Sequence, residues 1–319
     1  METIIQQIDY TVIVPVYNSE NTLQALFDRT KAVFESLDKS FEMIFVEDGG
    51  KDNSWKVLTQ IQKQNKNYVS AFRLNRNYGQ HNATFCGMDH ARGDYVITID
   101  DDLQTPPEEI KKLIESAEAE NSPDVVYGYY KKKQHSWIRN IGSRFLKYYT
   151  KTLFKAPGKG SSFRLFTHKI NEQILSHRTT MVFIDELLLW YAGNISFIEV
   201  EHKTSEKAKS GYNLFKLIRM FMNVILYSTV TPLKIMVYGG IFSALVSFAL
   251  GLYFIYRKMV HNVPLGYTSV IVTILFSTGI LLFFMGIIGK YLSRIFVIQN
   301  KKPPYLIKRA FSRKPESKP

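Results

Sequence analysis

The 319-residue chain has a single cysteine, Cys86, so no disulfide can form within it. A chain of this length has ample material for a packed core, and the missing crosslinks favour a reducing compartment. The chain also lacks internal repeats and low-complexity tracts. Its first ten residues, METIIQQIDY, are too short and too acidic for a signal peptide. With 45% apolar and 22% charged residues, the composition excludes a disordered or collagen-like chain.

Acidic residues are nearly absent from the last third of the chain. Residues 201–319 have 17 Lys and Arg against 3 Asp and Glu, whereas residues 1–200 have 24 against 25. The net charge of +13 therefore originates in the C-terminal third. The same third holds two uncharged apolar stretches, residues 235–256 and 267–289. At about 1.5 Å per residue, each covers a bilayer core of roughly 30 Å, which predicts two transmembrane helices.

Basic residues are concentrated outside the two apolar stretches and are few between them. A short loop joins the stretches, so both outer flanks lie on one side of the membrane, and the positive-inside rule predicts that this side is cytoplasmic. The sequence thus predicts a multi-pass protein of the inner (cytoplasmic) membrane, with the N-terminal domain and the tail in the cytoplasm. Because the basic residues adjoin membrane spans, they favour anionic lipid headgroups over nucleic acid as partners.

Strands and helices alternate through the N-terminal two thirds. Apolar runs predict strands at residues 11–17, 41–48, 68–74, 94–100 and 124–128. This order predicts an α/β domain with a mostly parallel, Rossmann-like sheet, in which ligands bind outside the carboxyl ends of the strands. The predicted organisation is a catalytic domain at 1–210, an interfacial amphipathic helix at 211–230, a transmembrane hairpin at 231–298 and a loose basic tail at 299–319.

Acidic side chains follow two of the predicted strands. Asp48 follows the second strand, and Asp100, Asp101 and Asp102 follow the fourth. Alternate residues of an extended segment point the same way, so Asp100 and Asp102 can face one site, with Gln104 near enough to add an oxygen. An all-oxygen set suits Mg²⁺ or Mn²⁺, which bind few protein ligands together with substrate phosphates. The alternative is a solvated acidic loop that caps the next helix.

Three segments resemble the motifs of the family 2, GT-A type nucleotide-sugar glycosyltransferases: VPVYNSENTL, VEDGGKDNS and LNRNYGQHNATFCGMDHARGDYVITIDDDLQTPPEEI. The third segment is similar to the polyprenyl-phosphate branch, and the resemblance runs from about Tyr10 to Leu217. The membrane hairpin extends it towards the bactoprenol-linked enzymes. The resemblance implies a GT-A fold, a nucleotide-sugar donor (commonly a uridine sugar) and a polyprenyl (undecaprenyl) phosphate acceptor. It further implies a divalent cation, inversion at the anomeric carbon and a homo-oligomer.

The resemblance also implies a role for individual residues. Those expected to bind the donor are Pro15, Tyr17, Asn18, Glu20, Asp48, Arg76, His81 and Asp100, with Asp101 as a spacer. Those expected to hold the metal at the pyrophosphate are Asp102 and Gln104. Those expected to bind the acceptor phosphate are Arg139, Ser143, Arg144, Arg164, Lys207 and Lys209. Several of these residues have a structural alternative. Tyr17 could belong to ordinary sheet packing, Asn18 to a helix cap, and Arg139 and Arg144 to a solvated helix face.

The sequence departs from the family pattern at several places. In the segment that resembles the DDGS motif, the first acid is Glu47 and Gly50 stands in place of the usual serine. Ser162 stands where an aspartate usually precedes the FRL segment, and FIDELLLW places Asp185 and Glu186 where an arginine and a glycine are typical. Asp185 is therefore a candidate catalytic base, a ligand for a sugar hydroxyl or amino group, or a surface acid. A base is needed if the acceptor is a sugar hydroxyl, whereas a lipid phosphate is already an oxyanion at neutral pH.

Three functional hypotheses follow. The first is transfer of a sugar to polyprenyl phosphate, and the second is transfer to a sugar hydroxyl of a lipid-linked glycan. The third is a non-enzymatic membrane scaffold or flippase partner, which the intact set of Asp100, Asp102 and Gln104 argues against. A processive polysaccharide synthase is disfavoured, because Trp190 follows LLL rather than the Q..R of that group and only two spans are predicted.

Overall fold

The computed structural model describes residues 8–130, 161–176, 183–202, 231–261, 266–300 and 302–313. The chain divides into two compact units, one formed by residues 1–207 with 301–319 and the other by residues 208–300. The amphipathic helix predicted at 211–230 lies outside the described residues.

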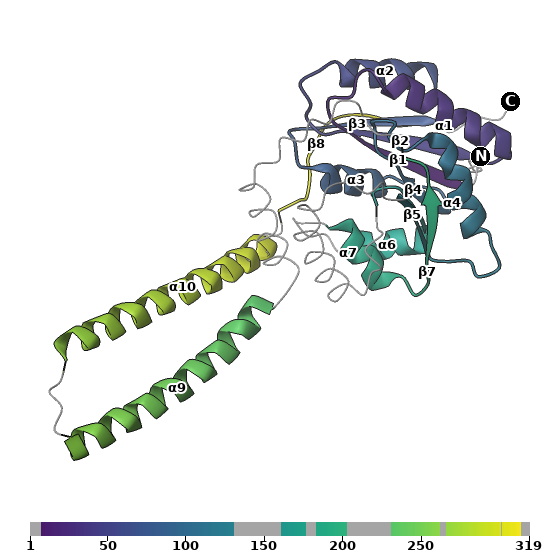
Figure 1. The fold of residues 1–319 in the computed structure, drawn as a ribbon. Coiled ribbons are helices and arrows are strands. Elements are labelled where there is room, and N and C mark those ends of the chain that lie inside the picture. Colours follow the sequence, from purple (N-terminus) through teal and green to yellow (C-terminus); the bar gives the residue numbers. More distant parts are fainter. Residues whose placement is uncertain are drawn as a thin grey trace. The chain divides into compact units, whose positions relative to one another are not determined.

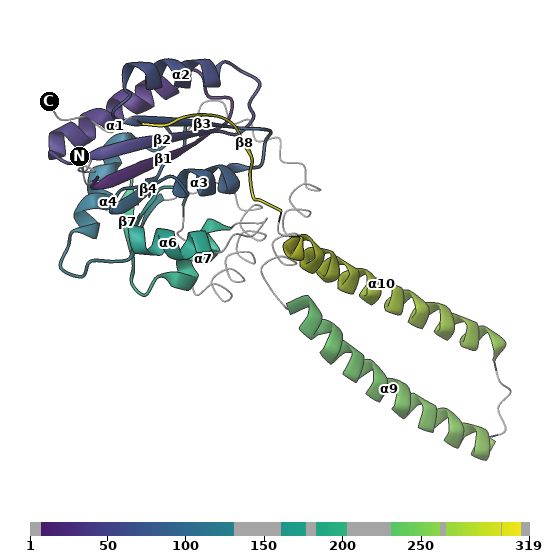
Figure 2. The ribbon, with the colours of Figure 1, turned by 180° about the vertical axis from the view of Figure 1, so that it is seen from behind.

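The first unit is built on one eight-stranded sheet with the order β7-β5-β6-β4-β1-β2-β3-β8 (Figures 1 and 2). Its strands are β1 (Tyr10–Val16), β2 (Phe41–Glu47), β3 (Val69–Leu74), β4 (Tyr95–Thr98), β5 (Val125–Tyr130), β6 (Arg164–Thr167), β7 (Ile195–Val200) and β8 (Ile307–Phe311). The pairs β1–β2, β1–β4, β2–β3 and β5–β7 are parallel, while β6 and β8 run antiparallel to their neighbours. The mostly parallel α/β sheet predicted from the sequence is confirmed.

Helices cover both faces of this sheet (Figure 1). They are α1 (Leu23–Leu37), α2 (Ser54–Gln64), α3 (Gln80–Met88), the short 3₁₀ turn η1 (Pro107–Glu109), α4 (Ile110–Ala117), α6 (His168–Ser176) and α7 (Ile184–Tyr191). Val12 and Val14 of β1 pack in the core under α1, α2 and α4, whereas Ile13 packs in the core under α3, α6 and α7. Successive side chains of a strand point to opposite faces, so an unbroken apolar run such as β1 fits a strand buried on both sides.

The five strands predicted from the sequence correspond to β1–β5, with ends that differ by up to two residues. Strands β6, β7 and β8 were not predicted. The expectation of a loose tail is wrong for Ile307–Phe311, which pairs antiparallel with β3. The side chains of β8 are all exposed, so the strand has no buried alternation that would reveal it in the sequence.

Side-chain contacts reinforce the pairing of β8 at the sheet edge. Phe311 stacks on Trp55 with ring centroids 5.7 Å apart. The hydroxyl of Tyr305 donates to Asp89 at 2.7 Å. The tail therefore gains order from partners on α2 and at the end of α3, which are far from it in sequence. It also covers the edge of β3, an otherwise open row of backbone donors and acceptors.

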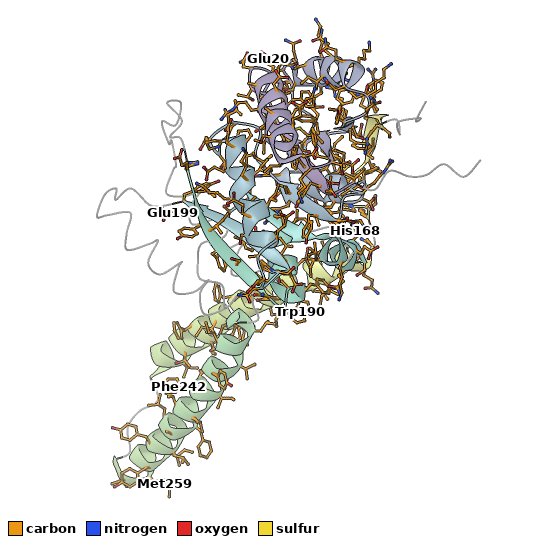
Figure 3. The ribbon with its side chains drawn as sticks, turned by 90° about the vertical axis from the view of Figure 1, so that its right-hand side faces the viewer. Glu20, His168, Trp190, Glu199, Phe242 and Met259 are labelled. Atoms are coloured by element: carbon orange, nitrogen blue, oxygen red, sulfur yellow. The ribbon has the colours of Figure 1, made fainter. Side chains whose placement is uncertain are left out.

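The second unit contains two long apolar helices, α9 (Thr231–His261) and α10 (Tyr267–Gln299). Among the described residues, the stretches long and apolar enough to cross a membrane are Ile235–Tyr253, with mean hydropathy 2.0, and Phe276–Ser293, with mean hydropathy 1.5. Neither stretch is buried inside the protein. Phe242, in the first stretch, and Met259, beyond its end in α9, are both exposed (Figure 3). A bare apolar surface of this size is what a membrane-embedded helix presents to lipid.

Candidate active site

Three loops meet at the carboxyl ends of β1, β2 and β4. Gly49, in the loop after β2, has a positive φ of 68°, and a Cβ there would lie 2.5 Å from the backbone carbon of Arg76. Glycine is required on both counts, because other residues avoid this conformation and a side chain would collide with the neighbouring loop. Gly49, the first glycine of the VEDGG segment, thus allows the loop after β2 to pack directly against the loop after β3.

The buried carboxylate of Asp48 and the partly buried carboxylate of Asp101 hold these loops together. The oxygens of Asp48 accept hydrogen bonds from the backbone N–H groups of Tyr78 at 2.7 Å and Gly79 at 2.8 Å. Asp101, expected only as a spacer, accepts from the backbone N–H of Tyr17 at 2.8 Å. Burial raises the pKa of both Asp48 and Asp101, although these hydrogen bonds oppose the shift. Asp101 therefore joins the loop after β4 to the loop after β1.

A first cavity of about 310 Å³ opens above these loops. Of the predicted donor-binding and metal-binding residues, its lining contains Pro15, Tyr17, Asp48, Asp100 and Asp102. Tyr17 is 48% exposed, so its ring is available for stacking. The structure thus brings together, from three separate loops, an aromatic ring and several carboxylates at one edge of the sheet.

Other predicted donor-binding residues do not line this cavity. Asn18 accepts a hydrogen bond from the backbone N–H of Lys51 at 2.8 Å, and Glu20 accepts one from the N–H of Asn53 at 2.8 Å. Both side chains thus hold the loop after β2. The guanidinium of Arg76 lies over the ring of Tyr78, 5.0 Å from its centroid. These contacts hold the loops that follow β1, β2 and β3, and none of the three residues lines the first cavity.

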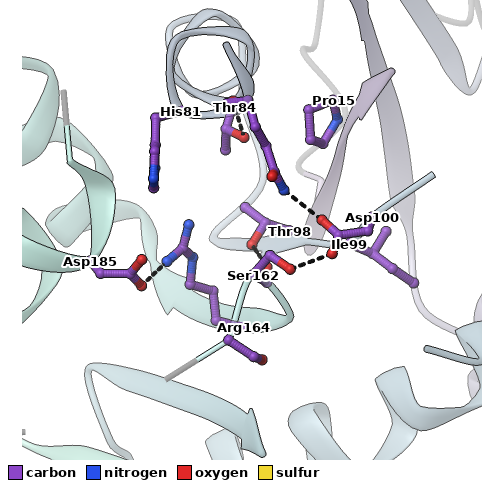
Figure 4. A pocket seen from close by; sticks show the side chains of 11 residues that line it. Pro15, His81, Thr84, Thr98, Ile99, Asp100, Ser162, Arg164 and Asp185 are labelled. Carbon is purple, nitrogen blue, oxygen red and sulfur yellow. Dashed lines mark hydrogen bonds and ion pairs between the residues drawn. The ribbon is translucent and has the colours of Figure 1, made fainter. Parts of the chain in front are cut away.

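A second cavity of about 260 Å³ adjoins the first and shares Pro15, Gln80 and Asp100 with it. Asp100 stands at the junction of the two cavities. Its oxygens accept hydrogen bonds from the amide of Gln80 at 2.6 Å and from the hydroxyl of Ser162 (Figure 4). Burial, followed by the charge of Asp102, raises the pKa of Asp100. Ser162 therefore binds Asp100 at the position where the resembling enzymes have an aspartate.

His81, Arg164 and Asp185 converge in the second cavity (Figure 4). Arg164, from β6, is 3% exposed and forms an ion pair through Nη1 with Oδ1 of Asp185, at the start of α7. The hydroxyl of Tyr127 donates to the same oxygen at 3.3 Å. Burial opposes the charge of Arg164, but the interactions with Asp185 and Tyr127 together outweigh it and raise the pKa of the guanidinium. Burial also lowers the pKa of His81, which is therefore neutral at pH 7.

Of the two predicted metal ligands, Asp102 lines the first cavity, whereas Gln104 does not. Asp102 forms no ion pair with any residue that the structure describes, and its Oδ1 accepts the backbone N–H of Gln104 at 3.0 Å. Within the described ranges, no three His, Cys, Asp or Glu side chains converge into a closed metal cage. Any cation here would depend on two or three protein oxygens and on ligands from a substrate.

Several predicted acceptor residues, Arg139, Ser143, Arg144, Lys207 and Lys209, lie outside the described residues. Conversely, the polar residues of the site that were not predicted include Gln80, Tyr127 and Ser162. Gln80 immediately precedes His81 in the NYGQHN segment, which was the available signal. Ser162 stands where an aspartate usually precedes the FRL segment, and this departure was its signal. Tyr127 carries no such signal, because its partners lie on other elements.

Comparison with known proteins places this site in context. Residues 11–177 match the model described as "Glycosyl transferase family 2", and residues 231–295 match that described as "GtrB C-terminal hairpin". The chain is 34% identical over 313 residues to the undecaprenyl-phosphate 4-deoxy-4-formamido-L-arabinose transferase of Serratia proteamaculans (strain 568), covering 96% of this chain and 94% of that protein. Similarly, the transferase of that name from Proteus mirabilis (strain HI4320) is 34% identical over 313 residues, covering 97% and 95%.

Solved structures support the fold. Mannosyl-3-phosphoglycerate synthase from Rubrobacter xylanophilus superimposes with a TM-score of 0.50 at 14% identity, covering 73% of this chain and 75% of that one. Glucosyl-3-phosphoglycerate synthase from M. tuberculosis also has a TM-score of 0.50, at 16% identity and with coverage of 69% and 78%. At this level of identity the likeness concerns the arrangement of the helices and strands alone.

Proposed function

The chain belongs to glycosyl transferase family 2, and we propose on this basis that it transfers a sugar from a nucleoside-diphosphate donor to a polyprenyl phosphate, with undecaprenyl phosphate as the acceptor. The observation that carries the proposal is the similarity to relatives named as undecaprenyl-phosphate transferases. That similarity extends over both the sheet domain and the membrane hairpin. An acceptor that is itself a lipid explains why a transferase domain is joined to two membrane helices.

The first cavity suits the nucleotide. Its exposed Tyr17 ring offers a stacking face for the base, and Pro15 lines the same wall. Asp100, at the junction of the cavities, would accept hydrogen bonds from ribose hydroxyls. Asp48 acts mainly by holding the backbone of Tyr78 and Gly79, since each of its oxygens already accepts an N–H group. Asn18 and Glu20 contribute by fixing the loop after β2.

The carboxylates of the first cavity fit Mg²⁺ or Mn²⁺. Asp100, Asp101 and Asp102 follow one another along the cavity wall, and the charge of Asp102 helps to raise the pKa of Asp100. Such crowding of like charges is relieved when a cation binds between them. Asp102 and Gln104 would hold the cation, with diphosphate oxygens completing its coordination. A bound cation stabilises the negative charge that develops on the departing nucleoside diphosphate.

The proposed reaction is a single displacement with inversion at the anomeric carbon. An oxygen of the lipid phosphate attacks that carbon, the bond from the carbon to the donor diphosphate breaks, and the nucleoside diphosphate leaves with the electron pair. A phosphate monoester has its second pKa near 6, so the nucleophile is already ionised at neutral pH and needs no general base. Asp185, predicted as catalytic, has one oxygen engaged by Arg164, and we assign it no proton transfer.

The membrane hairpin would hold the transferase domain at the cytoplasmic face. The chain carries two candidate membrane helices, α9 and α10, and the basic residues around them favour a cytoplasmic location for the domain and the tail. Arg139, Ser143, Arg144, Lys207 and Lys209 remain our candidates for binding the lipid phosphate, because phosphate recognition relies on clustered cations. A homo-oligomer also remains a prediction.

The full chain in detergent should convert a labelled nucleotide sugar and undecaprenyl phosphate into a labelled, chloroform-soluble product. The panel of donors should include UDP-glucose, UDP-galactose, UDP-N-acetylglucosamine, GDP-mannose and UDP-4-deoxy-4-formamido-L-arabinose. Omission of the lipid phosphate is the control, and chelation of divalent cations should abolish the product. If label enters only a lipid-linked glycan and never undecaprenyl phosphate, the acceptor assignment is wrong.

A further inference from the structure

We propose that Arg164 and Asp185 act together as a recognition pair for the donor sugar, hydrogen-bonding an uncharged substituent that can both donate and accept. The proposal rests on the proposed function, because it assumes a nucleotide-sugar donor. It deepens that function by assigning the second cavity to the sugar. It also gives Arg164 a role different from the acceptor-phosphate role that the resemblance implies.

The position of the second cavity supports this assignment. The two cavities share Pro15, Gln80 and Asp100, so a group attached to a nucleotide in the first cavity can extend past Asp100 into the second. The second cavity is lined by further hydroxyl-bearing residues, including Thr84, Thr98 and Ser161. A polar wall of this kind suits a sugar, which has hydroxyl groups around its ring.

Unused hydrogen-bonding capacity on the pair points to a ligand. Nε of Arg164 is fully buried and has no hydrogen-bond partner among the residues that the structure describes. Both contacts described for Asp185 go to Oδ1, and neither uses Oδ2. Arg164 and Asp185 both line the second cavity, so they bring an unused donor and an unused acceptor to the same cavity wall. A buried donor without a partner costs about 1–3 kcal/mol, which a bound polar group would offset.

The charges favour an uncharged group. Arg164 is already paired with Asp185, and His81, which faces them, is neutral at pH 7 because burial lowers its pKa. The cavity therefore offers no uncompensated positive charge to a lipid phosphate. A phosphate entering it would have to displace Asp185 from a buried guanidinium, whereas a hydroxyl or an amide can bind both members without breaking the pair.

The test measures donor binding by the full chain in detergent, without acceptor. The double variant R164M/D185N removes the guanidinium donor and replaces the charged carboxylate acceptor by a weaker, neutral amide. It leaves no buried unpaired charge, so it should fold. E172Q removes an exposed carboxylate from the neighbouring helix α6 and serves as the control. The ligands are UDP and GDP alone, then UDP-glucose, UDP-galactose, UDP-N-acetylglucosamine and GDP-mannose, each with Mg²⁺ and titrated by calorimetry.

We expect the double variant to bind the free nucleoside diphosphate within about twofold of wild type. Its affinity for the preferred nucleotide sugar should fall by about tenfold or more, and its discrimination among the sugars should shrink. Equal losses for the sugar-free and sugar-bearing ligands would overturn the proposal. Unchanged affinity of the double variant for the nucleotide sugar would also overturn the proposal. In that case a raised KM for undecaprenyl phosphate would indicate an acceptor site, and a lowered kcat alone would indicate a general base.

Because this binding assay contains no acceptor, it separates the inference from the proposed function. If wild type binds a nucleotide sugar through the pair yet forms no product on undecaprenyl phosphate, the acceptor assignment fails and the recognition pair stands. If wild type binds none of the panel in preference to its nucleoside diphosphate, no sugar is recognised and the pair has no such role.

Discussion

The pair of Arg164 and Asp185 is unequal in burial, and this inequality predicts unequal effects of removing each partner. The Arg164 side chain is 3% exposed, whereas that of Asp185 is 47% exposed. Asp185→Asn therefore leaves the charged guanidinium of Arg164 in the interior without a counter-charge. Arg164→Met leaves a carboxylate that water can reach, and it fills the interior with an apolar side chain of similar length.

Breaking a buried ion pair from one side costs about 3–5 kcal/mol. Since Asp185 is half exposed, we expect the lower end for Asp185→Asn, about 3 kcal/mol. For Arg164→Met we expect about 1 kcal/mol, mainly from imperfect packing. The double variant should lose about as much free energy of unfolding as Arg164→Met alone, because Asp185→Asn leaves no unpaired charge once Arg164 is absent. The coupling energy between the two positions is then about 3 kcal/mol.

Thermal unfolding of the full chain in detergent, followed by near-ultraviolet circular dichroism at one scan rate, measures these differences. For a domain of this size, 1 kcal/mol shifts the melting temperature by about 2–4 °C, so Asp185→Asn should melt roughly 6–12 °C below wild type. Glu172→Gln is the matched control and should melt within about 2 °C of wild type. If Asp185→Asn behaves like this control, or if the double variant melts as low as Asp185→Asn, the reasoning about the stranded guanidinium is refuted.

Three further predictions concern the tail, the metal and pH. Phe311→Ala removes a ring stacked on Trp55 and should lower the free energy of unfolding by about 1–2 kcal/mol, measured as a lower melting temperature; no change would mean that β8 adds little to the domain. Asp102→Asn removes a charged ligand, so Mg²⁺ should strengthen nucleoside-diphosphate binding much less than in wild type; an undiminished effect of Mg²⁺ in calorimetry would exclude Asp102 as a ligand. Burial raises the pKa of Asp48, so its carboxylate takes up a proton at a higher pH in the folded protein than in the unfolded chain. The Asp48 carboxyl therefore adds stability to the folded state as pH falls from 7 towards 4. The difference in free energy of unfolding between wild type and Asp48→Asn should therefore change in favour of wild type on acidification, and a change in favour of the variant would contradict the described burial.

Much of the site was open to prediction from the sequence, because its residues lie next to strands with strong local patterns. Pro15, Tyr17, Asp48, Asp100 and Asp102 follow buried apolar runs, and parallel strands bring their carboxyl ends to one edge. The direction of each side chain was less accessible. Asn18 and Glu20 follow the same strand as Tyr17, yet their side chains bind the backbone of the loop after β2.

The amino-acid sequence by itself determined the alternation of strands and helices, the two apolar stretches and the family motifs, since each depends on residues that are close together in the chain. Tertiary structure alone decided that Arg164 of β6 meets Asp185 of α7 and that Ile307–Phe311 completes the sheet beside β3. The physical reason is that a buried guanidinium and an exposed edge strand are each stabilised by a partner distant in sequence. Local periodicity carries no record of which distant partner the folded chain will supply.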